Sequence, residues 1–308
     1  RGIGFDLNRC LFIYVSHTLY QGGRKMLKVW IAGANGQIGR ALNDVLDPMQ
    51  IETLNTDLDE LDITDTDEVI NFGSINRPDV IINCTGITDT DECEKNPEHA
   101  YRVNALGARN LSIVARKCGA KIVQLSTDDV FDGKSKKPYT EFDDTNPLTV
   151  YGRSKRAGEN YVKEFTHKHF IIRSNWVYGK GGNNFVNRVL ETAEKGQALS
   201  VASDQFGSPT SAKDLARMIL YLIDTNEYGT YHVTCSGVCN RYEFATEILR
   251  LAGKEIELRS VPTEQSDLSS VRPPYAVLDN FILRIIEVYD MPDWKASLKE
   301  YMDERAED

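Results

Sequence analysis

The chain has 308 residues, which is enough for one large α/β domain, alone or with a smaller lobe attached. Hydrophobic residues make up 41% and charged residues 27%, as expected of a globular enzyme that buries a core. The net charge of -10 argues against a nucleic-acid surface, which needs a basic footprint, but a small anionic ligand can still bind to backbone N–H groups and a few cations.

The first 25 residues precede the pattern of the fold. Residues 10–20 are partly apolar, but this run is too short to cross a membrane and has neither a basic start nor a small-residue cleavage site. We expect residues 1–25 to be an extension outside the fold, and we expect no membrane association.

From Met26 onward, apolar runs of strand length alternate with amphipathic helices. Such runs indicate strands that are buried on both faces, as in a parallel sheet covered by helices. The sequence therefore predicts a Rossmann-type, doubly wound α/β fold. Strands are expected at 27–32, 51–54, 80–84, 121–126 and 170–173, with a helix through Ile38 and Leu46 and a long helix over 97–118.

Beyond about residue 175 the spacing becomes less regular. Helices are expected at 184–195, 211–224 and 240–252, the last with a capping box of Asn240 and Glu243, and a final helix near Asp293. The stretch 262–275 contains Pro262, Pro273 and Pro274 and is predicted to be an ordered loop. We assign 26–175, joined by 205–235, to a dinucleotide-binding domain, and 176–204 with 236–308 to a smaller C-terminal substrate-binding lobe.

Three glycines follow the first strand and open a helix. In Gly33-x-x-Gly36-x-x-Gly39, the first glycine allows the tight turn, the second lets a pyrophosphate approach the backbone, and the third lets helix and strand pack closely. Asp57, just after the second strand, can accept hydrogen bonds from the adenosine ribose, which favours NAD, although other acids crowd the same stretch. The choice between NADH and NADPH stays open.

Tyr151 and Lys155 form a Y-x-x-x-K pair. At this spacing both side chains lie on one face of a helix, and the ammonium is expected to lower the pKa of the phenol. Tyrosine can then exchange a proton with a substrate oxygen, and lysine can hold the nicotinamide ribose. Thr127 stands where the fourth strand ends, which is where open parallel sheets bind ligands, and its hydroxyl can bind the reacting oxygen.

Several segments together resemble the dTDP-4-dehydrorhamnose reductase family of the extended short-chain dehydrogenase/reductase superfamily. The resemblance runs from about Met26 to the final helix and includes GANGQIGRAL (33–42), YRVNALGARNL (101–111), QLSTDDVFDG (124–133), PLTVYGRSK (147–155), RSNWVYG (173–179) and SDQFGSPTSAKDLA (203–216). It implies reduction of the C4 ketone of a nucleotide-linked 6-deoxy-4-keto sugar, with dTDP-4-dehydro-L-rhamnose giving dTDP-L-rhamnose.

The resemblance also implies roles for individual residues. Thr127, Tyr151 and Lys155 match the catalytic triad of the superfamily, and the positions implied for the sugar nucleotide are Asp128, Trp176, Gln205 and Arg272. Those implied for NADPH or NADH are Gly33, Asn35, Gly36, Gln37, Ile38, Gly39, Asp57, Asp62, Ile63, Cys84, Thr85, Gly86, Asn104, Tyr151 and Lys155.

Two segments depart from the family pattern. Asp129 stands where the family usually has a tyrosine, and 85–91 differs from the usual A-A-x-T-A-V-D. Both departures fall where substrate would bind, so they put the identity of the sugar in doubt. An epimerase or dehydratase of the superfamily, and a regulatory subunit resembling the methionine adenosyltransferase regulatory protein, are alternative hypotheses.

The six cysteines form no C-x-x-C pair, so we expect no metal site. Scattered thiols fit a reducing compartment, and a cytoplasmic enzyme is expected. A homodimer is possible, and a nucleotide sugar is the expected small-molecule partner.

Overall fold

The computed structural model describes residues 26–47, 51–267, 272–286 and 290–307. The extension 1–25 and residues 268–271 of the proline-containing loop are outside the described residues. A six-stranded sheet in the order β2-β1-β3-β4-β5-β10 forms the centre of the molecule, and every neighbouring pair is parallel. Its strands are β1 (Lys28–Ala32), β2 (Glu52–Thr56), β3 (Val80–Asn83), β4 (Lys121–Thr127), β5 (His169–Ser174) and β10 (Gly229–His232).

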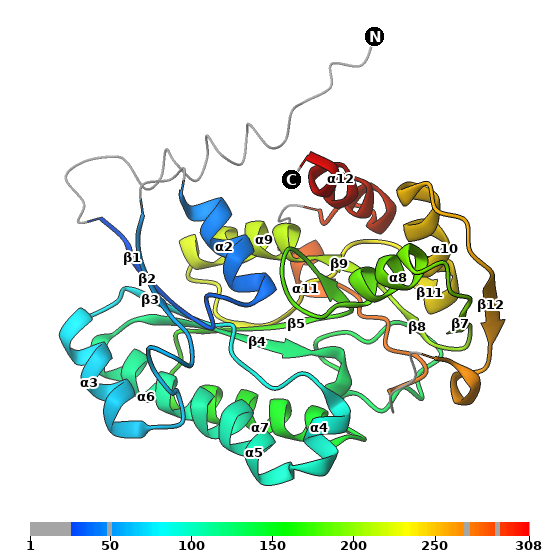
Figure 1. The fold of residues 1–308 in the computed structure, drawn as a ribbon. Helices are drawn as coiled ribbons and strands as arrows, with labels where there is room; N and C mark the ends of the chain where they lie inside the picture. The colour runs from blue at the N-terminus through cyan, green and yellow to red at the C-terminus, as the bar shows by residue number, and fades with distance from the viewer. Residues whose placement is uncertain (1–25, 48–50, 268–271, 287–289, 308) are drawn as a thin grey trace.

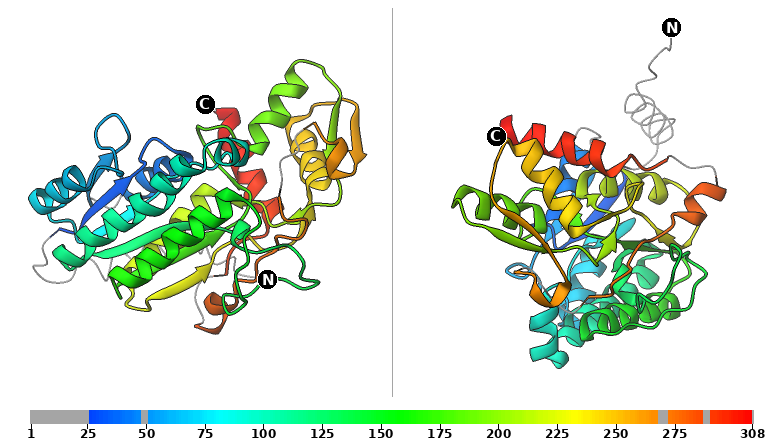
Figure 2. Two further views of the ribbon diagram at one scale, coloured as in Figure 1. Left: turned by 90° about the horizontal axis from the view of Figure 1, so that it is seen from below. Right: turned by 90° about the vertical axis from the view of Figure 1, so that its right-hand side faces the viewer.

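Helices cover both faces of this sheet (Figure 1). Side chains alternate along a strand, so Val29 and Ile31 of β1 join one core cluster, whereas Trp30 and Ala32 join the other. On the first face lie α2 (Gln37–Leu46) and α9 (Ala212–Asp224), and on the second lie α3 (Thr66–Asn76), α6 (Ala108–Cys118) and α7 (Val150–Phe165). Figure 2 shows α3, α6 and α7 side by side beneath the strands. The predicted Rossmann-type fold is confirmed.

The helix predicted over 97–118 is helical throughout, but it is not regular. It begins as α5 (Pro97–Tyr101), widens into a π-helical segment over Arg102–Gly107, and continues as α6. Asn104 lies in the widened segment, where α7 packs closely: a Cβ on Gly158 would stand 2.4 Å from the Asn104 carbonyl oxygen. Sequence periodicity alone does not reveal such a bulge. The sequence analysis also did not predict α3, α4 (Thr90–Lys95) and the edge strand β10.

Several of the remaining elements lie at the right-hand end of Figure 1, namely α8, α10 and the strands β7, β8, β11 and β12, whose bounds follow. The predicted helices are confirmed as α8 (Phe185–Glu194), α9, α10 (Arg241–Ala252) and α12 (Trp294–Glu307), and the Asn240–Glu243 capping box is present. Short strands link them in pairs: β6 (Val177–Tyr178) with β9 (Thr210–Ser211), β7 (Leu199–Ala202) with β12 (Leu258–Val261), and β8 (Phe206–Gly207) with β11 (Cys239–Asn240). Within the described ranges, no helix is both long and apolar enough to cross a membrane.

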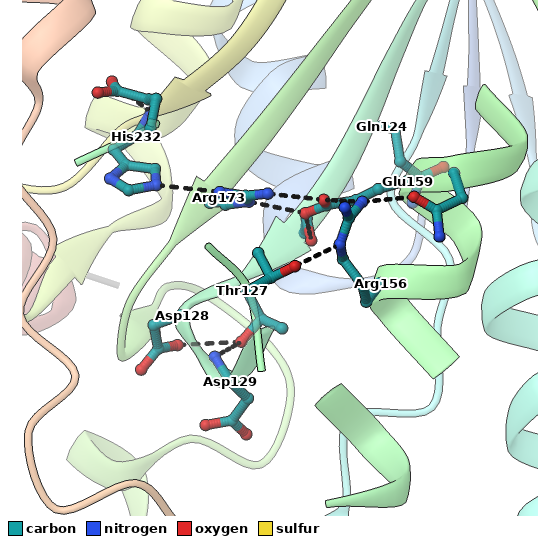
Figure 3. Close-up of polar contacts among 12 residues, drawn as sticks. Gln124, Thr127, Asp128, Asp129, Arg156, Glu159, Arg173 and His232 are labelled. Atoms are coloured by element: carbon teal, nitrogen blue, oxygen red, sulfur yellow. Dashed lines mark hydrogen bonds and ion pairs between the residues drawn. The ribbon is translucent and has the colours of Figure 1, made fainter. Parts of the chain in front are cut away.

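A buried ion pair fixes α7 against the sheet (Figure 3). The Glu159 carboxylate of α7 accepts hydrogen bonds from Nε and Nη2 of Arg173 on β5, both at 2.8 Å, and from the Ser126 hydroxyl of β4 at 2.6 Å. His232 of β10 lies beyond Arg173, with Nδ1 within 3.0 Å of the Tyr139 carbonyl oxygen. Burial and the charge of Arg173 lower the pKa of His232 to about 3, so the imidazole is neutral.

Removing the Glu159 carboxylate is expected to destabilise the fold strongly. Glu159→Ala leaves Arg173 buried without its partner, which costs about 3–5 kcal/mol of unfolding free energy in comparable cases. Burial works to raise the pKa of Glu159, but the hydrogen bonds and charge of Arg173 lower it overall. The contribution is therefore present above the unfolded-state pKa and is lost as the pH falls through the folded-state value.

Urea unfolding of wild type and variant at neutral and acidic pH measures this effect. Glu164→Ala is the matched control, because Glu164 is exposed on the same helix and its loss should stay within about 0.5 kcal/mol. Equal midpoints for the two variants at neutral pH would contradict the assignment.

Candidate active site

A cleft of about 450 Å³ opens where β3, β4 and β5 end. Open parallel sheets bind ligands at this edge, where side chains from several loops converge. One wall comes from the sheet and α7, and the other comes from the segments after β5 together with α8 and α10. The lining includes Gln37, Ile38, Cys84, Thr85, Thr127, Asp128, Tyr151, Lys155, Trp176, Gln205 and Arg272 of the predicted set.

The glycine turn lies at the end of β1 and opens α2. Gly33 has a φ of +81°, and a Cβ there would stand 2.9 Å from the Cys84 carbonyl carbon. A Cβ on Gly39 would stand 2.4 Å from the Gly33 carbonyl oxygen, so α2 can pack against the turn only with glycine here. Gly36 is the N-cap and provides no side-chain cap, which leaves the helix N-terminus open to an anion. This arrangement fits a dinucleotide pyrophosphate.

Two charged side chains hold the two ends of Asn35 in that turn. Its N–H donates to Oδ2 of Asp57 at 2.9 Å, and its carbonyl oxygen accepts from Nε of Arg40 at 2.8 Å. Asp57 thus stands beside the glycine turn, at the end of β2. Sequence analysis did not single out Arg40, which follows the last glycine directly.

Other members of the predicted cofactor set lie outside the cleft lining. Asn104 binds the Ile87 backbone through both amide atoms, at 2.9 and 3.0 Å, and also donates to the Ser154 hydroxyl of α7. It therefore ties the loop after β3 to the helix that bears Tyr151. Ile63 packs under Gly107, and Asp62 accepts from the Thr64 N–H at 2.8 Å. The structure gives these three residues framework contacts within the protein.

Tyr151 and Lys155 both line the cleft from α7, with 7% and 4% of their surfaces exposed. Burial lowers the pKa of Lys155 to about 8. The Lys155 ammonium lies close to the loop after β3, because a Cβ on Gly86 would stand 3.4 Å from its Nζ. The expected lowering of the Tyr151 pKa is wrong: burial and the nearby Asp129 carboxylate raise it. The cation that opposes this shift is Arg272, whose Cζ lies 5.6 Å from the ring centroid, and not Lys155. The phenol accordingly holds its proton at neutral pH.

Asp128 and Asp129 are adjacent and both buried, but their partners differ. Asp129 forms an ion pair with Arg272. Asp128 accepts hydrogen bonds from the Thr127 hydroxyl at 3.0 Å and from the Asn175 amide. Burial and the charge of Asp129 raise the pKa of Asp128 to about 7. Figure 3 shows Asp128, Asp129 and Thr127 together at the end of β4.

Arginines and an aromatic ring form the opposite wall of the cleft. Cζ of Arg241 lies 3.7 Å from the Trp176 ring centroid, and Arg188 and Arg272 line the same space. Burial, then the charges of Arg272 and Arg188, lower the pKa of Arg241 to about 9. Such a cluster can hold an anionic group with two phosphates. Sequence analysis missed Arg188, Arg241 and Asn175; Asn175 stands inside the RSNWVYG segment, but the arginines carry no motif.

Comparison with known proteins agrees with this geometry. Residues 27–307 match the family described as RmlD substrate binding domain. The spore coat polysaccharide biosynthesis protein SpsK of Bacillus subtilis is 40% identical, over 91% of this chain and 99% of that protein. A dTDP-4-dehydrorhamnose reductase structure from Clostridium acetobutylicum is 44% identical, with a TM-score of 0.88 over 91% of this chain and all of that one.

A second structure, the enzyme of the same name from Bacillus anthracis in complex with NADP, is 40% identical and has a TM-score of 0.88 over 91% of this chain and all of that one. The family match spans nearly the whole described fold. The chain belongs to the dTDP-4-dehydrorhamnose reductase family.

Proposed function

We propose that this protein uses NADPH or NADH to reduce the C4 ketone of a nucleotide-linked 6-deoxy-4-keto sugar, with dTDP-4-dehydro-L-rhamnose as substrate and dTDP-L-rhamnose as product. One observation carries the proposal: the Tyr151 phenol and the Thr127 hydroxyl lie in one cleft that reaches both the α2 N-terminus and the arginine cluster. The names of the relatives, one of them in complex with NADP, support it.

Each group in the cleft has a role in this proposal. The bound nicotinamide supplies hydride to the sugar carbon. Tyr151, which holds its proton because its pKa is raised, donates that proton to the C4 oxygen, and Thr127 binds the same oxygen. Lys155 binds the nicotinamide ribose. A phenol that stays protonated suits ketone reduction better than it suits the reverse oxidation.

The second wall would hold the rest of the substrate. The cluster of Arg188, Arg241 and Arg272 is placed to bind the diphosphate, and Asp128, Trp176 and Gln205 would face the sugar. In this arrangement residues 26–175 with 205–235 form the dinucleotide-binding domain, which also contributes Asp128 and Gln205 to the sugar site, and 176–204 with 236–308 form the smaller substrate-binding lobe. We place the enzyme in the cytoplasm, and sedimentation would test whether it forms a homodimer.

Tyr151→Phe is expected to abolish the steady loss of nicotinamide absorbance with dTDP-4-dehydro-L-rhamnose, because it removes the proton donor. General acids typically contribute about 10²- to 10⁴-fold to a rate. Tyr161→Phe, on the same helix outside the cleft, is the matched control and should keep the wild-type rate. A wild-type protein that binds cofactor but oxidises it with no nucleotide keto-sugar would contradict the proposed function and favour the regulatory alternative.

Arg40→Ala is expected to raise the KM for NADPH about tenfold and to leave the KM for NADH unchanged. Arg40 stands across Asn35 from Asp57, so its guanidinium can offset that carboxylate and bind a 2′-phosphate, a contact worth about 1.5 kcal/mol. Steady-state kinetics with both cofactors measures this effect. Arg116→Ala, an exposed site on α6, is the control, and equal changes for the two cofactors would refute the role of Arg40.

A further inference from the structure

The Thr127 hydroxyl has a single hydrogen to donate but several polar neighbours. Its oxygen accepts the Asp129 N–H at 3.2 Å, and it lies 3.0 Å from Oδ1 of Asp128. It also lies close enough to Tyr151 to lower the pKa of the phenol. An ionised carboxylate only accepts hydrogen bonds, so beside ionised Asp128 the Thr127 hydrogen points at Oδ1 and away from the substrate.

The second carboxylate oxygen of Asp128, Oδ2, accepts a hydrogen bond from the Asn175 amide. Oδ1 of Asn175 accepts the Ser208 N–H at 3.0 Å, which fixes the amide orientation and turns Nδ2 toward Oδ2 of Asp128. The same Nδ2 also donates to the Ala276 carbonyl oxygen at 2.8 Å. Because Oδ2 of Asp128 faces a donor, a proton on this carboxyl must reside on Oδ1, the oxygen that faces Thr127.

The surroundings of the two adjacent carboxyls differ. Asp129, on the same turn, forms an ion pair with Arg272. Asp128 has neutral hydrogen-bond partners, and it is 6% exposed. The charged and titratable groups that face Asp128 are Asp129 from the same turn, Tyr151 from α7, Arg241 from α10, and Arg272. Burial and the charge of Asp129 raise the pKa of Asp128, so this carboxyl can hold a proton near neutral pH.

We propose that Asp128 is a positioning residue that, when protonated, donates from Oδ1 to Thr127 and so frees the Thr127 hydroxyl hydrogen to bind the ketone oxygen of the substrate. The inference rests on the proposed reductase function. Asp128 keeps its proton throughout, since the proton transferred to the C4 oxygen comes from Tyr151. Ionisation of Asp128 turns the Thr127 hydrogen back toward the carboxylate, so reduction slows as the pH rises through the Asp128 pKa.

The pH profile of kcat tests this proposal. In wild type, kcat should fall as the pH rises through neutrality. In Asp128→Asn, whose amide donates to Thr127 at every pH, that fall should be absent, whatever the absolute rate. Thr127→Val should be slow and also lack the fall, whereas Thr127→Ser should keep it. Asp144→Asn, at an exposed acid, is the control and should show the wild-type profile.

A wild-type profile in Asp128→Asn, or a fall that persists in Thr127→Val, would overturn the proposal. A second readout needs no turnover: the infrared carboxyl band that is lost in Asp128→Asn reports the Asp128 titration directly in the free protein. Its midpoint should move to higher pH in Thr127→Val, because the Thr127 hydroxyl stabilises the ionised form. An unmoved midpoint would refute the coupling. Failure of the proposed function shows differently, as wild-type protein that reduces no keto-sugar at any pH.

Discussion

The ion pair between Glu159 and Arg173 is the interaction on which the geometry of the site depends. It joins α7 to β5, and the Ser126 hydroxyl joins the same carboxylate to β4, one residue before Thr127. Lys155 and Tyr151 lie one and two turns before Glu159 on α7, so the contacts that hold Glu159 also set the distance from the phenol to the end of β4. A Cβ on Gly152 would stand 2.1 Å from the Asp129 carbonyl oxygen, which shows how closely the helix meets the turn after β4.

Within the cleft, charge is divided in a way that suits reduction. Asp129 forms an ion pair with Arg272. Burial raises the pKa of the Tyr151 phenol, which therefore stays protonated. A proton donor thus lies beside the place where a ketone oxygen would gain negative charge. Arg188 and Arg241 line the cleft from α8 and α10, where phosphates rather than the reacting carbon would bind. Asp129 is the ion-pair partner of Arg272, whose guanidinium lies near the phenol.

Much of the fold follows from the sequence because the strands are buried on both faces. Runs that are mostly apolar, such as 27–32, predict parallel strands, and the glycine spacing predicts the turn that opens α2. The π-helical segment around Asn104 was not predicted, because the one residue that it adds shifts the apolar spacing by a single position, which is hard to distinguish within an irregular pattern. The edge strand β10 escaped notice because its sequence, Gly-Thr-Tyr-His, is short and mostly polar.

The site was predictable where a motif fixes both residue type and spacing, as for Gly33, Tyr151 and Lys155. It was not predictable where function depends on partners far apart in sequence. Arg272 reaches Asp129 across 143 residues, and Asn175 reaches Ala276 across 101. For that reason the predicted direction of the Tyr151 pKa shift was wrong. The sequence spacing indicates Lys155 as the charged neighbour of the phenol, whereas the folded chain places Arg272 and Asp129 beside the ring.

A crystal structure of the protein with NADP and dTDP-L-rhamnose is the most direct test of the account. We expect the C4 oxygen of the sugar within hydrogen-bond reach, about 2.6–3.2 Å, of both the Tyr151 and Thr127 hydroxyl oxygens, with the diphosphate against Arg188, Arg241 and Arg272. A sugar bound with C4 turned away from Tyr151, or a nicotinamide ring outside the cleft, would contradict it.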